Sequence, residues 1–580
     1  MNPVIYYHPE AYTTTGPKLM GRNAAGESFL RGFLKHSHST EFWAQVQRNE
    51  HGQHFAQQVK SMGRDEKVHC VTAHNLNAIS QAGLVYHPGP GIGEHAFHRS
   101  LAGQTRLPNN SLKHGNSAWA LCGITHTTSS AGAMDAISAF ITSPVQTWDA
   151  LICTSNAVKN NVTKLLQAQV DMLKERLGIS KLVLPMMPVI PLGIHTQDFE
   201  YSPQQKSLSR QKINADSNTL VVLFMGRLSF HAKAHPLAMY QALQIAAQQV
   251  KVQGLKIKLL ECGWHANEFI EKAYQDAALL ACPDVQVVTL DGRKAEDRET
   301  AWASADVFCS LSDNIQETFG IVPIEAMAAG LPVVVSDWDG YKDTVRHGID
   351  GFRIPTLMPE AGLATDLAQR HALDVDTYDM YCGHTSSLIA VDIKQAADAF
   401  TQLFNSSELR AQMGAAGKAR AQSTYDWRVI IQQYEALWSE QEKVRTLNAE
   451  GNTSDSPNLA WPARMDPFYA FESYPTHLLH RNTLLELSVP MHAKNSTEIL
   501  AHIQSLRALA MVNYAKIVLP TEAELGAVVQ QALQGPQAAI ALVQHVPAQR
   551  QAFVFRSLAW LVKLGILQAK SPSTLPKSSV

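Results

Sequence analysis

The chain has 580 residues, of which 45% are hydrophobic and 17% charged, and its formal net charge is −2. This length exceeds what one hydrophobic core supports, so we expect two large domains and a smaller unit. Because the chain has no dense run of Lys and Arg, its charge pattern gives no indication of nucleic-acid binding. The seven cysteines are scattered, mostly in apolar runs, which is typical of reduced thiols in the cytosol.

The N-terminus has neither the basic region nor the long apolar stretch of a signal peptide. No segment approaches the ~20 apolar residues that a membrane-spanning helix needs. We therefore expect a soluble, cytoplasmic protein, for which peripheral contact with a membrane surface is left open.

The first third of the chain alternates between β-rich runs and helical patterns. A short β-rich run at 4–8 is the expected first strand, and residues 158–177 have helical periodicity. Such alternation predicts a parallel sheet flanked by helices. The other β-rich runs lie at 68–73, 83–87, 119–126, 150–155 and 182–194.

A turn-rich loop that contains Gly26 follows the first expected strand, and a helical pattern begins near Phe29. A glycine lets the backbone approach a ligand where a side chain would clash. The loop matches neither the Walker motif nor the dinucleotide-binding glycine pattern, so a plain connecting loop is an equal alternative.

Two histidine-bearing segments are candidates for a functional site. His126 closes a buried strand at its carboxyl end, where side chains face the ligand crevice of a parallel sheet, although a structural histidine is the more common case. Residues 87–98 contain His95, His98 and Glu94, but they lack further ligands at the spacing of known metal sites. A Gly/Pro loop is the preferred interpretation of that segment.

The pattern restarts after a polar stretch at 202–217, which contains Pro203 and is predicted to be an interdomain linker. The run 219–225 is a new buried strand. Two doubly wound sheets in series are therefore predicted, with the ligand-binding site in the cleft between them. The further strands of the second sheet are expected at 255–260, 285–290, 305–311 and 331–336.

Arg227 and Lys233 follow the first strand of the second sheet, in the loop that opens its first helix. Two cations near the positive end of a helix dipole are unfavourable unless an anion lies between them. Arg offers a bidentate fork and Lys a point charge, which together suit a diphosphate. A surface lysine paired with a carboxylate is the alternative.

The stretch 312–330 holds two carboxylates, Glu317 and Glu325, eight positions apart, with Phe319 and Gly320 just after the first. It lies between two buried strands, so it forms a loop and a helix N-terminus at the edge where parallel sheets bind ligands. Free backbone N–H groups at such a terminus attract anions.

Together these residues resemble the retaining glycosyltransferases of family 4, which have the two-domain GT-B fold. The resemblance covers residues 1 to about 443 and is most specific from Glu317 to Gly340. In that family a helix crosses back to the N-terminal domain, and the apolar stripe of residues 427–438 fits such a helix. Ala25 stands beside Gly26 where relatives often have a second glycine, and residues 359–392 lengthen the common core.

The resemblance implies that Arg227 and Lys233 bind the donor diphosphate and stabilise it as the leaving group. It implies that the amides of Phe319 and Gly320 add backbone donors, and that Glu325 accepts hydrogen bonds from the donor ribose.

It further implies that Glu317 contacts the transferred sugar, that His126 lies near the sugar and the acceptor, and that Gly26 lets the N-terminal loop close on the phosphates. Leaving and attacking groups would share one face of the sugar. No metal and no cofactor are implied.

We thus predict a metal-independent, retaining hexosyltransferase that moves a sugar from a nucleoside-diphosphate sugar to a hydroxyl of a glycan or glycolipid, in glycan or cell-surface polysaccharide biosynthesis. The alternatives are a GT-B sugar-nucleotide epimerase or phosphorylase, and a non-catalytic sugar-nucleotide-binding protein. The predicted parts are a Rossmann-like acceptor domain (1–202), a Rossmann-like donor domain (203–426), the crossing helix (427–443), a linker (444–465), a small mainly helical appendage (466–570) and a disordered tail (571–580).

Overall fold

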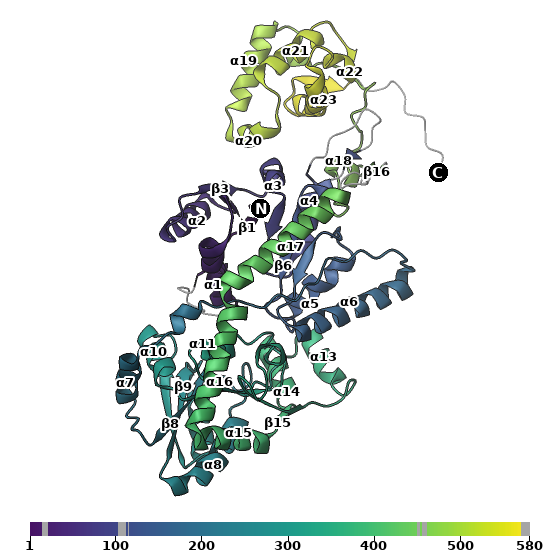
Figure 1. The fold of residues 1–580 in the computed structure, drawn as a ribbon. Coiled ribbons are helices and arrows are strands. Elements are labelled where there is room, and N and C mark those ends of the chain that lie inside the picture. The colour runs from purple at the N-terminus through teal and green to yellow at the C-terminus, as the bar shows by residue number, and fades with distance from the viewer. Residues whose placement is uncertain (14–20, 103–111, 114, 449–452, 455–460, 570–580) are drawn as a thin grey trace. The chain divides into compact units, whose positions relative to one another are not determined.

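The computed structural model describes the chain except for residues 14–20, 103–111, 114, 449–452, 455–460 and 570–580 (Figure 1). It divides into two compact units, Met1–Pro462 and Ala463–Val580. The predicted tail at 571–580 and part of the predicted linker lie outside the described residues.

The first sheet of the larger unit has six parallel strands in the order β3-β2-β1-β4-β6-β7, which confirms the predicted parallel sheet. Its strands are β1 (Val4–Tyr6), β2 (Glu41–Gln45), β3 (Lys67–Val71), β4 (Leu84–Tyr86), β6 (Ala120–Ile124) and β7 (Ala150–Ile152). Its helices are α1 (Gly21–His36), α2 (Asn49–Ser61), α3 (Leu76–Ala82), α4 (Ile92–Ser100), α5 (Ala131–Ser138) and α6 (Asn156–Leu177).

Two features of this sheet differ from the prediction. Strand β2 was not predicted. The run 182–194 is not a strand, because only single residues of it, such as Met186 and Val189, form isolated bridges to β7 and the residue after it. Its apolar residues cover the sheet edge without a continuous ladder.

The second sheet is also six-stranded and parallel, in the order β10-β9-β8-β11-β12-β13, so the predicted pair of doubly wound sheets is confirmed. Its strands are β8 (Thr219–Met225), β9 (Lys256–Gly263), β10 (Val285–Asp291), β11 (Val307–Ser310), β12 (Val333–Ser336) and β13 (Gly351–Ile354). Its helices are α7 (Pro203–Lys212), α8 (Leu237–Val250), α9 (Glu268–Ala281), α10 (Ala295–Ser304), α11 (Ile321–Ala328), α12 (Tyr341–Thr344), α15 (Ile393–Asn405) and α16 (Ser407–Arg420).

The prediction that residues 202–217 form a linker is wrong, because helix α7 occupies most of this range. Ser202 and Gln205 form a reciprocal capping box, and Pro203 is the first helical residue. Proline is favoured there because its missing N–H would have no partner inside the helix. Pro203 therefore starts this helix.

Helix α17 (Trp427–Asn448) returns the chain to the first sheet and is five residues longer than predicted (Figure 1). Its apolar stripe is buried in the core of the first sheet domain, with Trp427, Tyr434 and Trp438 near Phe29 and Phe33. Just before it, the backbone N–H of Ile194 donates to the Tyr425 carbonyl at 2.8 Å, and that of Trp427 donates to the Ile194 carbonyl at 3.0 Å.

The extension at 359–392 forms a helical pair between two short antiparallel strands. Asp376 joins the two helices through ion pairs to Arg370 and His384. The elements are β14 (Thr356–Leu357), α13 (Thr365–Ala372), α14 (Tyr378–Ser386) and β15 (Ala390–Val391).

The smaller unit, from Ala463 on, has its own hydrophobic core and is mainly helical, as predicted. It also holds a three-stranded antiparallel sheet that the sequence did not indicate, since its strands are only two to four residues long. Its main elements are β17 (Leu484–Leu487), α19 (Ser496–Arg507), α21 (Glu522–Ala532), β18 (Gln537–Ala538), α23 (Ala548–Lys563) and β19 (Leu567–Ala569). Within the described ranges, no helix combines the length and apolar character needed to cross a bilayer.

Candidate functional site

Three of the predicted site residues lie just beyond the carboxyl ends of two neighbouring strands. Arg227 and Lys233 follow β8, and Glu317 follows β11, which pairs with β8 in parallel. This sheet edge is where open α/β sheets bind ligands.

The side chain of Lys233 pairs with that of Glu317, with 2.5 Å between Nζ and Oε2. The two side chains are 28% and 12% exposed. The pairing matches the alternative considered for Lys233, a lysine neutralised by a carboxylate, except that this carboxylate is largely buried. A diphosphate that binds Lys233 must share the ammonium with Glu317 or displace it.

Backbone amides hold the other oxygen of Glu317. Its Oε1 accepts hydrogen bonds from the N–H groups of Gly320 at 3.1 Å and Thr318 at 3.4 Å. Burial raises the pKa of Glu317, but Lys233 and these two amides outweigh burial and hold the pKa below its usual value. Glu317 is therefore a fixed carboxylate, and the Gly320 amide, predicted to face phosphates, is occupied by it.

Gly320 permits the turn that brings its amide to Glu317. Its φ is +77°, and a Cβ there would lie 1.8 Å from the ring of Tyr341, so both conformation and space require glycine. The neighbouring Phe319 side chain is 2% exposed and packs in the domain core. The predicted contribution of the Phe319 amide stays a prediction.

Glu325 lies half-buried on α11, one turn beyond this loop. Burial raises its pKa to about 8, and the positive charge of Arg298 offsets only part of that effect. A carboxyl in such a place is stabilised by added hydrogen-bond donors, which ribose hydroxyls would supply.

Arg227 closes its own loop, since its Nη2 donates to the Ala232 carbonyl at 2.8 Å. Two contacts tie this loop to the one after β11: the His235 N–H donates to Asp313 at 3.2 Å, and the Asn314 amide donates to the His231 carbonyl at 3.1 Å. The two loops therefore form one connected surface around Lys233 and Glu317.

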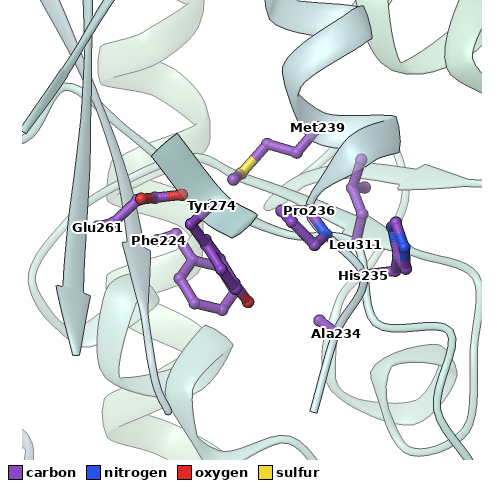
Figure 2. Close-up of a pocket in the computed structure, with 8 residues that line it drawn as sticks. All are labelled: Phe224, Ala234, His235, Pro236, Met239, Glu261, Tyr274 and Leu311. Atoms are coloured by element: carbon purple, nitrogen blue, oxygen red, sulfur yellow. The ribbon is translucent and has the colours of Figure 1, made fainter. Parts of the chain in front are cut away.

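A small cavity lies behind the loop after β8 (Figure 2). Its volume is about 10 Å³, which holds no more than one water molecule, so it is not a sugar site. Glu261 points into it, accepts a hydrogen bond from Tyr240 at 2.5 Å and has its pKa raised to about 7 by burial. The lining residues are Phe224, Ala234, His235, Pro236, Met239, Glu261, Tyr274 and Leu311.

The first sheet domain reaches the same loop through the residues after β6 and β7. The Thr318 hydroxyl donates to the His126 carbonyl at 3.0 Å, and the Ser155 hydroxyl donates to the Thr318 carbonyl at 2.8 Å. His126 is thus adjacent to the residue that follows Glu317. The structure brings together His126, Glu317, Lys233 and Arg227 from three loops.

The expectation that Gly26 lies in a loop is wrong. Gly26 lies within α1, and a Cβ on it would come 2.0 Å from the carbonyl oxygen of Ala11. Close packing of the helix on residues 9–11 explains the glycine. Residues 14–20 of the predicted loop lie outside the described residues, and the phosphate-closing role of Gly26 stays a prediction.

The segment 87–98 is only partly a loop, because His95 and His98 lie on α4. The rings of His87 and His95 stack with centroids 3.8 Å apart, and burial lowers the pKa of His95 to about 4. The stacked, neutral imidazole rings of His87 and His95 therefore pack against each other, as structural histidines do. In the part of the chain that the structure covers, no three His, Cys, Asp or Glu residues are grouped as a metal site.

One functional candidate was missed by the sequence reasoning. Asp339 has a φ of +44°, and its pKa is raised well above the usual range, first by burial and then by the charge of Glu317. Its Oδ1 lies 3.5 Å from the Ser155 hydroxyl. The spacing of Asp337 and Asp339 was a signal that could have identified it, and a second such pair, Asp374 and Asp376, lies in the extension.

The family model "Glycosyl transferases group 1" matches residues 205–364, which hold Arg227, Lys233, Glu317 and Glu325 but not Gly26 or His126. Residues 205–364 form a group 1 glycosyl transferase domain. The chain is 33% identical over 156 residues to phosphatidyl-myo-inositol mannosyltransferase of Mycobacterium leprae, covering 26% of this chain and 32% of the relative. It is 27% identical over 183 residues to lipopolysaccharide 1,2-N-acetylglucosaminetransferase of Salmonella typhimurium, covering 31% and 46%.

The matches to these two curated relatives span less than half the length of each. Among solved structures, Anabaena HepE in complex with UDP superposes with a TM-score of 0.48 at 15% identity, covering 76% of this chain and 100% of that one.

Proposed function

We propose that this protein is a retaining glycosyltransferase that moves a hexose from a nucleoside-diphosphate sugar to an acceptor hydroxyl. The carrying observation is the Lys233–Glu317 pair, whose lysine shares the loop after β8 with Arg227, at the carboxyl edge of the group 1 glycosyl transferase domain. Cations at that edge suit a diphosphate leaving group, whose developing charge they would stabilise in the transition state.

The division of roles follows from the environment of each carboxylate. Glu317 is ionised and has both oxygens engaged, which suits holding a sugar hydroxyl or Lys233 better than acting as a nucleophile. Glu325, with its raised pKa, would bind the ribose. His126, from the other sheet domain, would face the sugar and acceptor. The mechanism needs no metal, since Arg227 and Lys233 supply the positive charge.

The acceptor class is proposed from the named relatives. One is a mannosyltransferase acting on a phosphatidyl-myo-inositol, and another transfers N-acetylglucosamine in lipopolysaccharide. We therefore propose a glycan or glycolipid acceptor in cell-surface polysaccharide biosynthesis. The protein would act in the cytoplasm, with peripheral membrane contact when the acceptor is a lipid.

The test is incubation of the full chain with a panel of nucleoside-diphosphate sugars, with and without glycan and glycolipid acceptors and with EDTA. Release of nucleoside diphosphate, unchanged by EDTA, and a product whose anomeric configuration matches the donor are expected. An isomerised sugar nucleotide would indicate an epimerase, and phosphorolysis of a glycan would indicate a phosphorylase. Binding of a donor without turnover would indicate a non-catalytic sugar-nucleotide-binding protein.

A pair of variants connects the assay to the site. Lys233→Met should remove turnover and weaken donor binding. Lys212→Met is the matched control, because Lys212 forms an exposed ion pair with Glu296 on the same domain. Equal loss in both variants would show that the cations of the β8 loop have no special role.

A further inference from the structure

The extension at 359–392 contacts the loop behind His126. The hydroxyl of Tyr378 on α14 lies 3.2 Å from the Thr127 hydroxyl and 3.2 Å from the Ser129 hydroxyl. Those two hydroxyls lie 3.1 Å from each other. Three hydroxyls from segments about 250 positions apart therefore form one hydrogen-bonded triangle.

The same helix contacts the donor side. A Cβ on Gly383 would come 2.8 Å from the Cβ of His231, so α14 packs closely on the loop between Arg227 and Lys233. The side chain of Gln316, the residue before Glu317, also lies near the Tyr378 hydroxyl. Helix α14 is thus in contact with all three loops that carry the proposed catalytic and diphosphate-binding side chains.

The direction of the Tyr378 side chain is fixed within the extension. Thr377 caps the helix by accepting the Met380 N–H at 3.3 Å. Just before it, Asp376 is 6% exposed and accepts hydrogen bonds from Arg370 at 2.8 and 2.9 Å. A charge-assisted pair of this kind holds its partners in one geometry. Tyr378 therefore starts from a rigid helix end.

We infer that Tyr378 is a positioning residue, which fixes the loop after His126 relative to Glu317 through its hydrogen bonds to Thr127 and Ser129. This inference rests on the proposed function. It assigns a role to the extension, because the extension would carry the hydroxyl that holds the acceptor-side loop against the donor-side loop.

The physical reason is that the contact joins groups from two domains. Donor contacts of Arg227, Lys233 and Glu325 come from the second sheet domain alone, so donor affinity does not depend on the triangle. The approach of His126 to the sugar depends on both domains. A misplacement of about 1 Å at a reacting centre can lower the rate by about 100-fold.

The experiment compares Tyr378→Phe with Tyr381→Phe in the full chain. Tyr381 lies on the same helix and stacks on His371 within the extension, with ring centroids 4.3 Å apart, so it is a matched control. We expect Tyr378→Phe to lower kcat by about tenfold, a fraction of the loss that misplacement can cause, with unchanged donor affinity in calorimetry. Tyr381→Phe should keep the wild-type kcat.

A coupling test separates positioning from general destabilisation. Thr127→Val with Ser129→Ala should lower kcat at least as much as Tyr378→Phe does, because it also removes the acceptor of the Ser129 N–H. Adding Tyr378→Phe to this pair should cause no further loss, because both hydrogen bonds of Tyr378 to the loop are already gone. The inference would be overturned if the kcat losses of the separate variants added up in the combined variant. It would also be overturned if donor affinity fell across the variants in proportion to their melting temperatures.

The inference and the proposed function fail in different ways. Unchanged kcat in Tyr378→Phe, with a wild type that transfers sugar, would overturn the positioning role alone. A wild type that turns over no donor would overturn both.

Discussion

The Nζ of Lys233 lies 2.5 Å from Oε2 of Glu317, and this ion pair joins the loops that follow β8 and β11. Its members are 84 positions apart in the chain. Because Glu317 also accepts the Gly320 amide, one carboxylate organises both the cationic loop and the start of α11. Binding of the proposed donor diphosphate at Lys233 would therefore be coupled to the rearrangement of an internal ion pair.

Removing the cation should destabilise the fold as well as the activity. Lys233→Met leaves the largely buried Glu317 without its counter-charge, and we expect a loss of roughly 2–3 kcal/mol in the free energy of unfolding, below the range for fully buried pairs. Urea denaturation measures this loss. The double variant Lys233→Met, Glu317→Gln should recover most of the stability but no activity. If the single variant is as stable as wild type, the pair is only a surface contact.

Glu325 should make stability depend on pH in a defined direction. Its pKa is raised to about 8, so the folded state binds a proton that the unfolded state releases near pH 4.5. Stability from this group therefore decreases as pH rises between those two values. Glu325→Gln should flatten the melting temperature across that range, and Glu325→Ala should weaken donor binding. A pH profile of Glu325→Gln identical to that of the wild type would contradict the raised pKa of Glu325.

His126 should affect turnover more than donor affinity. Its backbone is bound by Thr318, so replacing the side chain leaves that contact in place. His126→Ala is expected to lower kcat by about 10²-fold, because the side chain would face the sugar and acceptor where a small misplacement is costly, with little change in calorimetric donor affinity. Thr318→Val tests the backbone contact separately. Equal losses in kcat and affinity for His126→Ala would place the histidine in donor binding instead.

Gly26 offers a direct comparison between a packing role and a ligand-binding role. Gly26→Ala forces a Cβ to within 2.0 Å of the Ala11 carbonyl, so α1 must shift. We expect a loss of about 1–3 kcal/mol in unfolding free energy, as for other overpacked sites. Calorimetry with the donor at low temperature should show the affinity of the wild type. A weakened donor affinity with unchanged stability would favour the phosphate-closing role.

Sequence patterns predicted most of the strands whose side chains are almost all buried. Strand β8 matches its predicted range because six consecutive apolar residues follow Thr219 and are packed on both faces of a parallel sheet. Strand β2 was missed because only three of its five residues, Phe42, Trp43 and Ala44, are apolar. The false strand at 182–194 shows the opposite limit, since short apolar runs also occur in segments that cover a sheet edge. Helix α7 was missed because Pro203 both breaks and starts helices, and only the capping partner distinguishes the two cases.

The sequence identified candidate residues for the site, but it could not show which of them contact one another. The glutamates, Arg227 and Lys233 were identified from their positions after strands, yet no local pattern reveals that Lys233 pairs with Glu317. The bridge from Tyr378 to Thr127 is likewise invisible in sequence, because it depends on how an added helical pair folds back over the cationic loop.

The backbone contacts around Ile194 have a mechanical consequence. The chain passes between the two sheet domains once near Ile194 and again near Tyr425 and Trp427, and hydrogen bonds of 2.8 and 3.0 Å join the two passages side by side. Two adjacent crossings act as a single pivot. Any rotation of one sheet domain against the other would therefore move atoms near Ile194 least and would open the Thr318–His126 and Tyr378–Thr127 contacts by an amount that grows with their distance from that pivot.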